Sequence, residues 1–352
     1  MADLQDRFGN ICIVMLSAIG DAVHVLPVAN ALKRAAPAVP LTWVIQPVPY
    51  MLVRDHPAID KFVIFQRSRG MRVLRDYRET LGHLRRQRFD LVINLQVYLK
   101  AGLLTAGTRA DMKLGFDRAR ARDLNWLFTT HRIPAHEPQH VQDQYFEFLE
   151  YLGITPEPVE WKILLSEEEK DAQRRFFEKF DRPVCAVVTG TSKAQKNWAP
   201  DRYAKLLEII ENDFGYRTIV VGGPSAVEKS RASEIIRLTS ARPANELGHD
   251  LRRLVYLLGG ADIVVSPDTG PLHIARALDV PVVGLYGYTN PKRSGPYRKY
   301  TDLVADGYAR SRDEDYPISM EYRREGMGRV TLEMVQEKFD LAVTRYVRPS
   351  RV

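Results

Sequence analysis

The sequence predicts an α/β protein built from two doubly wound parallel-sheet domains. Short continuous apolar runs alternate with segments of helical periodicity, a pattern typical of strands buried on both faces of a parallel sheet. The alternation occurs twice, and a break with two prolines at residues 154–158 separates the two series. A length of 352 residues fits two domains of roughly 150 residues each. We therefore expect one domain over residues 1–160 and a second over residues 161–352.

The first domain contains four predicted strands. A helix with Val25, Ala29 and Leu32 on its apolar face follows the first strand and ends near residue 37. A basic helix is expected over residues 80–88, before the last strand. The resulting β-α-β-α order implies a doubly wound sheet. The predicted strands are residues 11–16, 41–45, 62–65 and 91–95.

The second domain repeats this order. Its helices are expected at residues 202–212, from residue 225 to 238, at 251–258 and at 271–278. We assign a last helix, residues 331–346, to this domain and leave open that it packs back on the first domain. The predicted strands are residues 184–188, 217–221, 263–265 and 282–286.

Composition excludes several classes of protein. The two cysteines, Cys12 and Cys185, both lie in strand-like apolar runs, which excludes a disulfide framework and a cysteine-based zinc site and fits a reducing compartment. No apolar run reaches the roughly 18 residues of a membrane span. The first ten residues lack a basic-then-apolar signal pattern.

Positive charge is concentrated in the first domain. The chain has 51 Lys and Arg against 44 Asp and Glu, a net charge of +7. Residues 61–122 hold 15 Lys and Arg against 5 Asp and Glu, a net charge of +10. Such a stretch favours an anionic partner: nucleic acid, a membrane surface or an acidic glycan. The plainer interpretation is an arginine-rich solvated surface.

The loop at residues 266–275 is the strongest candidate for binding chemistry. It follows a strand and opens a helix with proline at the first helical position. The free N–H groups of the helix start, the Thr269 hydroxyl and Gly270 together predict an anion cradle. His273, on the first turn, can face the same ligand. The plainer alternative is a tight turn before a helix that Asp268 or Thr269 caps.

Two further loops carry candidate residues. The loop at residues 189–198 also follows a strand, and Lys196 could neutralise a diphosphate there, but the loop lacks the Gly-Lys-Ser/Thr ending of a Walker A site. The loop at residues 17–24 places Asp21 at a helix start, with His24 one turn further on. The helix dipole favours an ionised Asp21, which could act as a general base or simply cap the helix.

Together the three loops resemble the ADP-heptose:lipopolysaccharide heptosyltransferase family, glycosyltransferase family 9. The most specific match is Asp-Thr-Gly-Pro-Leu-His-Ile-Ala at residues 268–275, continuing to residue 287. Gly-Asp-Ala-Val-His at residues 20–24 is the second match, and Lys-Asn-Trp at residues 196–198 is the third. The resemblance extends from about residue 11 to about residue 345.

The resemblance implies a GT-B fold, with an acceptor-binding N-terminal domain and a nucleotide-sugar-binding C-terminal domain facing across a cleft. It implies inverting transfer of a heptose from ADP-heptose to the inner core of lipopolysaccharide, with Asp21 as the catalytic base. Implied donor-binding residues are Thr189, Gly190, Lys196, Glu228, Leu247, Asp268, Thr269, Gly270 and His273. Implied acceptor-binding residues are Gly20, His24, Gln96, Lys100 and Arg122.

The resemblance also sets expectations for cofactors, partners and location. The helix start and Lys196 would stabilise the leaving ADP, so we expect no cofactor and no obligatory metal. The expected partners are the nucleotide sugar, an anionic lipopolysaccharide core and the inner-membrane surface, with no nucleic acid. The expected location is the cytoplasmic face of the inner membrane of a Gram-negative-type bacterium. Neutralising Arg85, Arg86 and Arg88 together should then weaken membrane association more than donor binding.

Two departures from the family pattern stand out. Tyr288-Thr289-Asn290-Pro291 replaces Pro-Thr-Asp-Pro, and residues 308–327 have no recognised counterpart. Three alternatives remain open. They are a GT-B enzyme with another nucleotide sugar, such as an epimerase, a non-catalytic glycan- or nucleotide-binding homologue, and a nucleic-acid binder.

Overall fold

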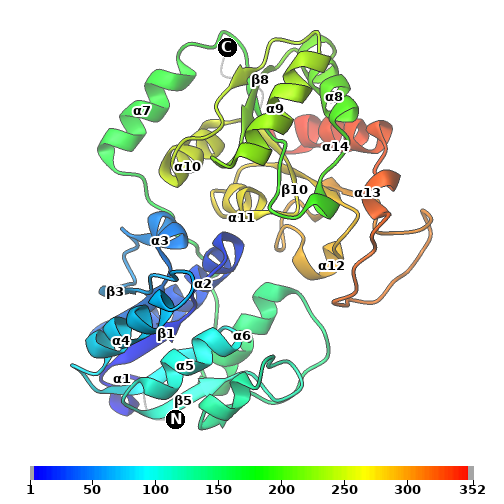
Figure 1. Ribbon diagram of the computed structural model, residues 1–352. Coiled ribbons are helices and arrows are strands. Elements are labelled where there is room, and N and C mark those ends of the chain that lie inside the picture. Colours follow the sequence, from blue (N-terminus) through cyan, green and yellow to red (C-terminus); the bar gives the residue numbers. More distant parts are fainter. Residues whose placement is uncertain (1–3, 348–352) are drawn as a thin grey trace. The chain divides into compact units, whose positions relative to one another are not determined.

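The computed structural model describes residues 4–347 and divides into two compact units (Figure 1). The first unit runs to Glu137 and includes Val141–Leu164, whereas the second comprises Pro138–His140 and the chain from Leu165 onward. The boundary expected after residue 160 thus lies a few residues early. Trp161 is buried and its carbonyl accepts a hydrogen bond from His56, which ties this stretch to the first unit.

The first unit contains a six-stranded parallel sheet in the order β3-β2-β1-β4-β5-β6. Its central strands are mostly apolar and almost entirely buried, as expected for a sheet covered on both faces. The strands are β1 (Ile11–Val14), β2 (Leu41–Ile45), β3 (Lys61–Ile64), β4 (Phe89–Asn94), β5 (Ala110–Gly115) and β6 (His131–Arg132).

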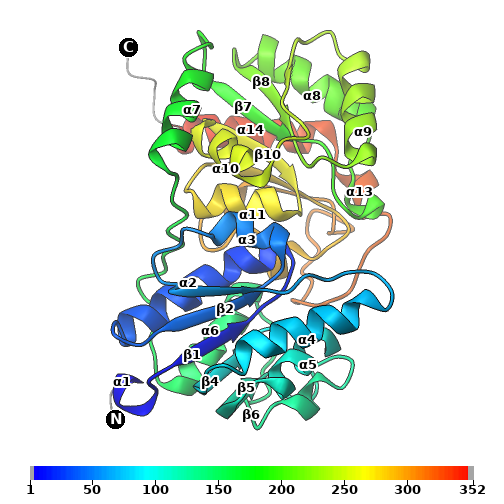
Figure 2. The ribbon, with the colours of Figure 1, turned by 60° about the vertical axis from the view of Figure 1, so that its left-hand side comes forward.

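Helices cover both faces of this sheet. Helices α4 and α5 lie side by side over a core that includes Val14, Val92 and Leu104 (Figure 1), and α2 packs against α6 (Figure 2). The helices are α1 (Leu4–Arg7), α2 (Ile19–Ala35), α3 (Pro47–Val53), α4 (Arg72–Leu84), α5 (Leu99–Gly107) and α6 (Val141–Leu152), with the 3₁₀ helix η1 (Asn125–Phe128).

The second unit repeats the architecture with the strand order β12-β11-β10-β7-β8-β9, again parallel. The doubly wound α/β class predicted from the sequence is therefore confirmed for both halves. The strands are β7 (Val184–Val188), β8 (Arg217–Val221), β9 (Ala244–Asn245), β10 (Ile263–Pro267), β11 (Val282–Tyr286) and β12 (Val304–Asp306).

The helices of the second unit form two groups, since α8 contacts α9 and α14, and α10 contacts α7 and α11. The last helix belongs to this unit, because α14 packs on β11, β12 and α8 and buries Val335 and Phe339 there. The helices are α7 (Glu167–Phe177), α8 (Pro200–Asn212), α9 (Ala226–Leu238), α10 (Leu251–Gly260), α11 (Gly270–Ala277), α12 (Pro291–Ser294), α13 (Gly326–Arg329) and α14 (Leu332–Arg345), with the 3₁₀ helices η2 (Ala194–Lys196) and η3 (Thr301–Leu303).

One predicted helix is displaced along the chain. The basic helix expected at residues 80–88 is α4, which spans Arg72–Leu84. Val73, Tyr77, Leu81 and Leu84 recur at helical spacing and face the core, so the helical period begins about two turns before residue 80. Arg85, Arg86 and Arg88 consequently lie beyond the helix.

Residues 308–325, which make up most of the stretch 308–327 without a recognised counterpart, are held at both ends by glycine contacts. Gly307 and Gly287 both approach the backbone of Gly326 so closely that a β-carbon on any of the three would overlap backbone atoms of another. Gly287 directly follows β11 and begins the loop that carries Thr289, so this contact fixes the start of a loop at the carboxyl end of the second sheet.

We expect Gly326→Ala to destabilise the protein by about 3 kcal/mol, because the new methyl group would overlap the Gly287 carbonyl and force the two segments apart. Gly328→Ala, in the same short helix, is the matched control, since a β-carbon there meets no atom within 4 Å. Urea denaturation of the two variants measures the difference. Equal stability of both variants would show that the glycine contact is not tight.

Candidate active site

Most of the predicted site residues lie at the carboxyl ends of strands where the strand order reverses. In the first sheet this point is between β1 and β4, and in the second it is between β10 and β7. Open parallel sheets bind ligands outside such points. Gln96 lies in the loop after β4, and Asp21 and Lys100 lie in the first turns of the helices that follow β1 and β4. The loops after β7 and β10 carry Thr189 and Asp268.

The Asp21 carboxylate caps the N-terminus of α2. Its Oδ2 accepts a hydrogen bond of 2.7 Å from the backbone N–H of Ala18, the N-cap residue. Its Oδ1 lies 3.5 Å from the hydroxyl of Tyr145 on α6. Asp21 is half-buried. The carboxylate therefore caps the helix through one oxygen, while the other lies beside a phenol that sequence reasoning missed.

Gln96 and Lys100 are tied to the same loop. The Gln96 amide donates to the Ser17 carbonyl at 2.6 Å and its Oε1 accepts from the Leu16 N–H at 3.2 Å. Lys100 Nζ donates to Ser17 Oγ at 2.7 Å. Burial lowers the pKa of Lys100, and Arg67 lowers it further, whereas the charge of Asp21 acts in the opposite direction. These side chains therefore form one polar cluster around the β1–α2 loop.

The other predicted acceptor residues have different surroundings. His24 is buried, and its Nδ1 lies 3.0 Å from Gln142 Oε1 on α6, so its ring belongs to the packing between α2 and α6. Gly20 is half-buried in the first turn of α2. Arg122 is exposed and its backbone N–H donates to the Val97 carbonyl at 2.8 Å. Acceptor binding by these three residues stays a prediction.

In the second unit, Asp268 lies at the centre of a charged cluster. Lys196 Nζ is 2.6 Å from Asp268 Oδ2 and 3.1 Å from the Asp268 carbonyl. His273 Nε2 on α11 is 3.7 Å from Oδ1, and the Thr289 hydroxyl donates to Oδ2. Lys196 therefore meets Asp268 and His273 although it lies 72 residues before Asp268, because β7 and β10 are neighbouring strands.

The electrostatics of the cluster favour an ionised carboxylate. Burial of Asp268 opposes ionisation, but the hydrogen bond from His273 and the charge of Lys196 outweigh it and hold the pKa of Asp268 well below its usual range. Thr269 occupies the N-cap position of α11, and neither it nor Asp268 caps the helix through a side chain. That part of the sequence prediction is wrong, since the Asp268 carboxylate is engaged by Lys196 and Thr289 instead.

A second group of predicted donor residues surrounds the ends of β7 and β8. Glu228 accepts hydrogen bonds from the Gly223 N–H at 3.2 Å and the Ser225 hydroxyl at 2.6 Å. A β-carbon on Gly190 would lie 2.7 Å from Glu228 Cγ, and one on Gly222 would lie 3.6 Å from a methyl group of Leu247. The structure therefore places Glu228 and Leu247 beside the glycine-containing turns after β7 and β8.

Thr189 is buried at the end of β7 and has an unusual hydroxyl. Its Oγ1 has no hydrogen-bond partner within residues 4–347, although its carbonyl accepts from Arg231 Nε at 2.8 Å. Buried polar atoms nearly always have a partner, so this hydroxyl is a candidate ligand contact. Sequence reasoning missed Arg231, which lies one turn beyond Glu228 on α9 and carries no motif that would identify it.

The segment that had no counterpart packs beside these loops. Tyr322 stacks on Tyr288 with ring centroids 4.8 Å apart, and the Lys193 ammonium lies 5.3 Å from the centre of the Tyr322 ring. Asn290 Nδ2 donates to the Pro317 carbonyl at 2.8 Å. The segment therefore connects the Lys193–Lys196 loop to the loop after β11, where the sequence departs from the family pattern.

Two kinds of feature are absent from the described residues. Among residues 4–347, no helix is both long and apolar enough to cross a membrane. Within the same residues, no three His, Cys, Asp or Glu side chains gather in a group that could hold a metal ion.

These groups combine two kinds of chemistry. The cluster around Asp21 offers a carboxylate on a helix N-terminus, which can accept a proton. The cluster around Asp268 offers an ammonium, an imidazole and the start of a helix, which together suit an anionic group such as a phosphate.

Comparison with known proteins identifies the family. The sequence pattern of glycosyltransferase family 9 (heptosyltransferase) matches residues 78–321. The chain is 30% identical over 297 residues to the lipopolysaccharide core heptosyltransferase OpsX of Haemophilus influenzae, covering 84% of each protein. It is 29% identical to lipopolysaccharide heptosyltransferase 1 of Pseudomonas aeruginosa, also covering 84% of each.

Solved structures agree on the fold. A family 9 glycosyltransferase from Veillonella parvula superposes with a TM-score of 0.80 at 21% identity, covering 96% of this chain and 97% of that one. The E. coli heptosyltransferase WaaC with ADP-2-deoxy-2-fluoro heptose gives a TM-score of 0.69 at 21% identity, covering 94% and 99%. The fold predicted from the resemblance, GT-B, is confirmed. With two parallel-sheet units, the motif loops at their strand ends and these relatives, the chain is a glycosyltransferase that belongs to family 9, the heptosyltransferases.

Proposed function

We propose that the protein transfers a heptose from ADP-heptose to the inner core of lipopolysaccharide with inversion at the anomeric carbon. The relatives named above are lipopolysaccharide heptosyltransferases, and one solved neighbour holds an ADP-heptose analogue. The observation that carries the proposal is the Lys196–Asp268–His273 cluster, because Asp268 holds the Lys196 ammonium at the start of α11, where backbone N–H groups can also bind a diphosphate.

In this mechanism Asp21 accepts the proton of the attacking acceptor hydroxyl. The acceptor oxygen forms a bond to the anomeric carbon while the bond from that carbon to the β-phosphate oxygen breaks, so ADP leaves with the electron pair. Lys196 and the N–H groups at the start of α11 stabilise the charge that develops on ADP, and we propose that they suffice without a metal. The unpartnered Thr189 hydroxyl is a candidate donor to the same diphosphate.

The adenosine would lie beside Glu228 and Leu247. A carboxylate next to the Gly222–Gly223 turn can accept hydrogen bonds from ribose hydroxyls, and Leu247 provides an apolar surface for a base. On the acceptor side, the Lys100 ammonium suits the carboxylates and phosphates of an anionic glycan. We place the reaction at the cytoplasmic face of the inner membrane, where a nucleotide sugar and a lipid-anchored acceptor meet.

Thermal shift with ADP, UDP and GDP tests the donor assignment. A nucleotide at a hundredfold excess over its Kd stabilises the folded protein by about 2.7 kcal/mol, a rise of several degrees, and we expect this for ADP. A preference for UDP would contradict the donor. Incubation with a panel of nucleotide sugars and truncated lipopolysaccharide, read by mass, tests transfer. Turnover of a nucleotide sugar without an acceptor would instead identify an epimerase-like enzyme.

A further inference from the structure

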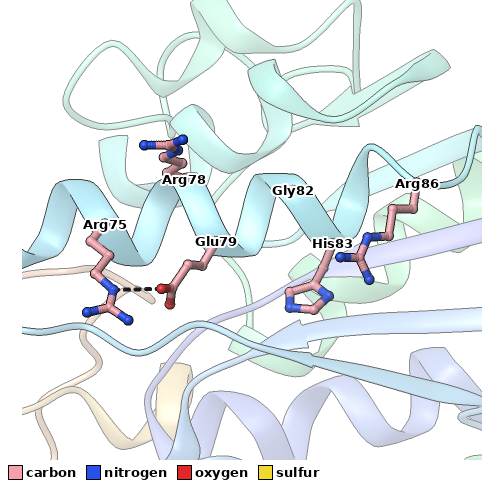
Figure 3. Close-up of a pocket in the computed structure, with 6 residues that line it drawn as sticks. All are labelled: Arg75, Arg78, Glu79, Gly82, His83 and Arg86. Carbon is pink, nitrogen blue, oxygen red and sulfur yellow. Dashed lines mark hydrogen bonds and ion pairs between the residues drawn. The ribbon is translucent and has the colours of Figure 1, made fainter.

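The outer face of α4 is positively charged. Figure 3 shows this part of the helix, with Arg75 and Glu79 pointing toward one another, and Arg75 Nε lies 2.6 Å from Glu79 Oε1. Three arginines and one carboxylate lie on this surface, and Arg75 is the arginine that pairs with Glu79. The surface hollow here is lined by Arg75, Arg78, Glu79, Gly82, His83 and Arg86.

The inner face of α4 fixes the helix on the first unit. Val73, Tyr77 and Leu81 pack against the buried core beneath it, and Leu84 is part of that core. The arginines thus project from a helix whose apolar side is already buried, so the side chains of the outer face are not part of the packed core.

Apolar side chains surround the arginines on the same surface. Met71 and Leu74, at the start of α4, are 81% and 61% exposed. On α5, Leu99 and Leu103 are 40% and 39% exposed, and Leu127 on η1 is 55% exposed. Single exposed leucines are ordinary, but a group of them bordering a basic helix marks an interaction surface.

These elements form one continuous surface. Tyr77 on α4 donates a hydrogen bond to the Lys100 carbonyl on α5 at 3.1 Å, and Asn125 on η1 donates to the Tyr98 carbonyl, at the start of α5, at 2.6 Å. We use the term α4–α5 face for its exposed arginines and apolar side chains: Arg72, Arg75, Arg78, Arg86, Met71, Leu74, Leu99, Leu103 and Leu127.

We propose that the α4–α5 face docks the protein on an anionic lipid bilayer. Arginines attract anionic headgroups, and exposed leucine and methionine side chains can enter the headgroup boundary, which is how interfacial helices bind membranes. A nucleic acid would satisfy the arginines but would leave the leucines without apolar contacts. The combination of the two side-chain types therefore favours a bilayer.

The α4–α5 face lies close to the predicted acceptor-binding residues. The role of membrane docking in catalysis therefore rests on the proposed function. Leu99 directly precedes Lys100, whose Nζ contacts Ser17 in the loop that holds Asp21. A bilayer bound at Leu99 would thus bring a lipid-anchored acceptor close to the acceptor cluster.

Of the arginine set predicted from the sequence, Arg85, Arg86 and Arg88, two have contacts within the first unit, and the effect of neutralising all three stays a prediction. Arg85 Nε donates to the Gly107 carbonyl at 2.9 Å, and Arg88 pairs with Asp111. These two side chains are engaged within the first unit, which leaves Arg86 as the member of that set on the α4–α5 face.

The test compares the full chain with Arg75→Gln/Arg78→Gln/Arg86→Gln in sedimentation with vesicles. Each basic residue near an anionic membrane surface contributes a similar amount to the binding free energy. The triple variant should therefore bind vesicles of phosphatidylcholine with 30% phosphatidylglycerol roughly a hundredfold more weakly. The matched control is Arg175→Gln/Arg182→Gln/Arg237→Gln, which removes the same charge from exposed positions of the second unit and should bind like the unaltered protein.

A second variant, Leu74→Ser/Leu103→Ser, tests the apolar contribution. It should weaken vesicle binding at high salt as well as low salt, because apolar contacts are not screened. Equal binding by the unaltered protein and both first-unit variants would overturn the proposal, and so would an equal loss in the control. Salt-sensitive binding to duplex DNA without vesicle binding would instead favour nucleic acid.

Vesicle binding and transfer are measured separately, so that the two proposals can fail independently. The vesicles contain no acceptor, and transfer is measured on a delipidated, water-soluble core. The triple variant should keep its ADP thermal shift and its transfer to this core. Vesicle binding without transfer would contradict the proposed function but support membrane docking. Transfer without vesicle binding would support the proposed function but contradict membrane docking.

Discussion

Asp21→Asn should lower the rate of heptose transfer by about a thousandfold, because a general base contributes roughly 10²–10⁴ to the rate. The asparagine oxygen can still accept the Ala18 N–H hydrogen bond, so the cap on α2 and the fold should remain. The thermal shift produced by ADP should be unchanged, since Asp21 belongs to the first unit. Initial rates from labelled donor, with the nucleotide titration alongside, provide the measurement.

Asp21→Ala separates the two roles of this carboxylate. It removes the cap as well as the base, and loss of such a cap costs about 1 kcal/mol of stability. Ser166→Ala is the control, because Ser166 is the N-cap residue of α7, accepts a hydrogen bond from the Glu169 N–H through its side chain and lies in no predicted site. That control should lose stability but not activity. Transfer by either Asp21 variant at near the unaltered rate would exclude the general-base role.

Lys196→Met should weaken ADP binding by about tenfold to a hundredfold, since a charge-assisted contact to a phosphate contributes about 1.5–3 kcal/mol. It should also destabilise the protein by about 3 kcal/mol, because Asp268 would remain buried without its ammonium partner. Lys193→Met, in the same loop, is the control, since Lys193 contacts the Tyr322 ring and not Asp268. Equal losses of ADP affinity in both variants would indicate general electrostatics rather than contact by Lys196.

Asp268→Asn tests the Lys196–Asp268 pair through the pH dependence of stability. The folded-state pKa of Asp268 is depressed, so the unfolded chain binds more protons as pH falls below the ordinary value of about 3.9. The pair therefore stabilises the protein fully above that value and progressively less below it. Thermal melts from pH 3 to pH 7 should show a smaller loss of stability toward acid in Asp268→Asn than in the unaltered protein. Parallel curves would show that the pair is not coupled to folding.

The elements that were predicted well are the apolar strands. The runs at residues 41–45, 184–188, 217–221 and 282–286 have the same bounds in the structure, because burial on both faces requires an unbroken apolar run. Strands at the sheet edges were missed. Strand β5 contains Asp111 and Lys113 and is half exposed, and β6 and β9 have two residues each, so no apolar run marks them.

The candidate site could be predicted as loops but not as contacts. Motif resemblance identified Lys196, Asp268 and His273, and adjacency of β7 and β10 explains why they meet. Tyr145 could not be anticipated, because its contact with Asp21 depends on packing between α2 and α6, more than a hundred residues apart. Thr289 lay in a stretch identified as a departure from the family pattern, yet its bond to Asp268 depends on the path of the loop after β11.

The glycine contact between Gly307 and Gly326 has a consequence for how this chain can diversify. Since the backbone at these two positions meets directly, the intervening residues leave and re-enter the fold at one point. Each doubling of the length of such a loop costs only about 0.6 kcal/mol of loop-closure entropy. Residues 308–325 can therefore change in length at little entropic cost, whereas changes at Pro317 or Tyr322 would also alter the loops that carry Lys193 and Asn290.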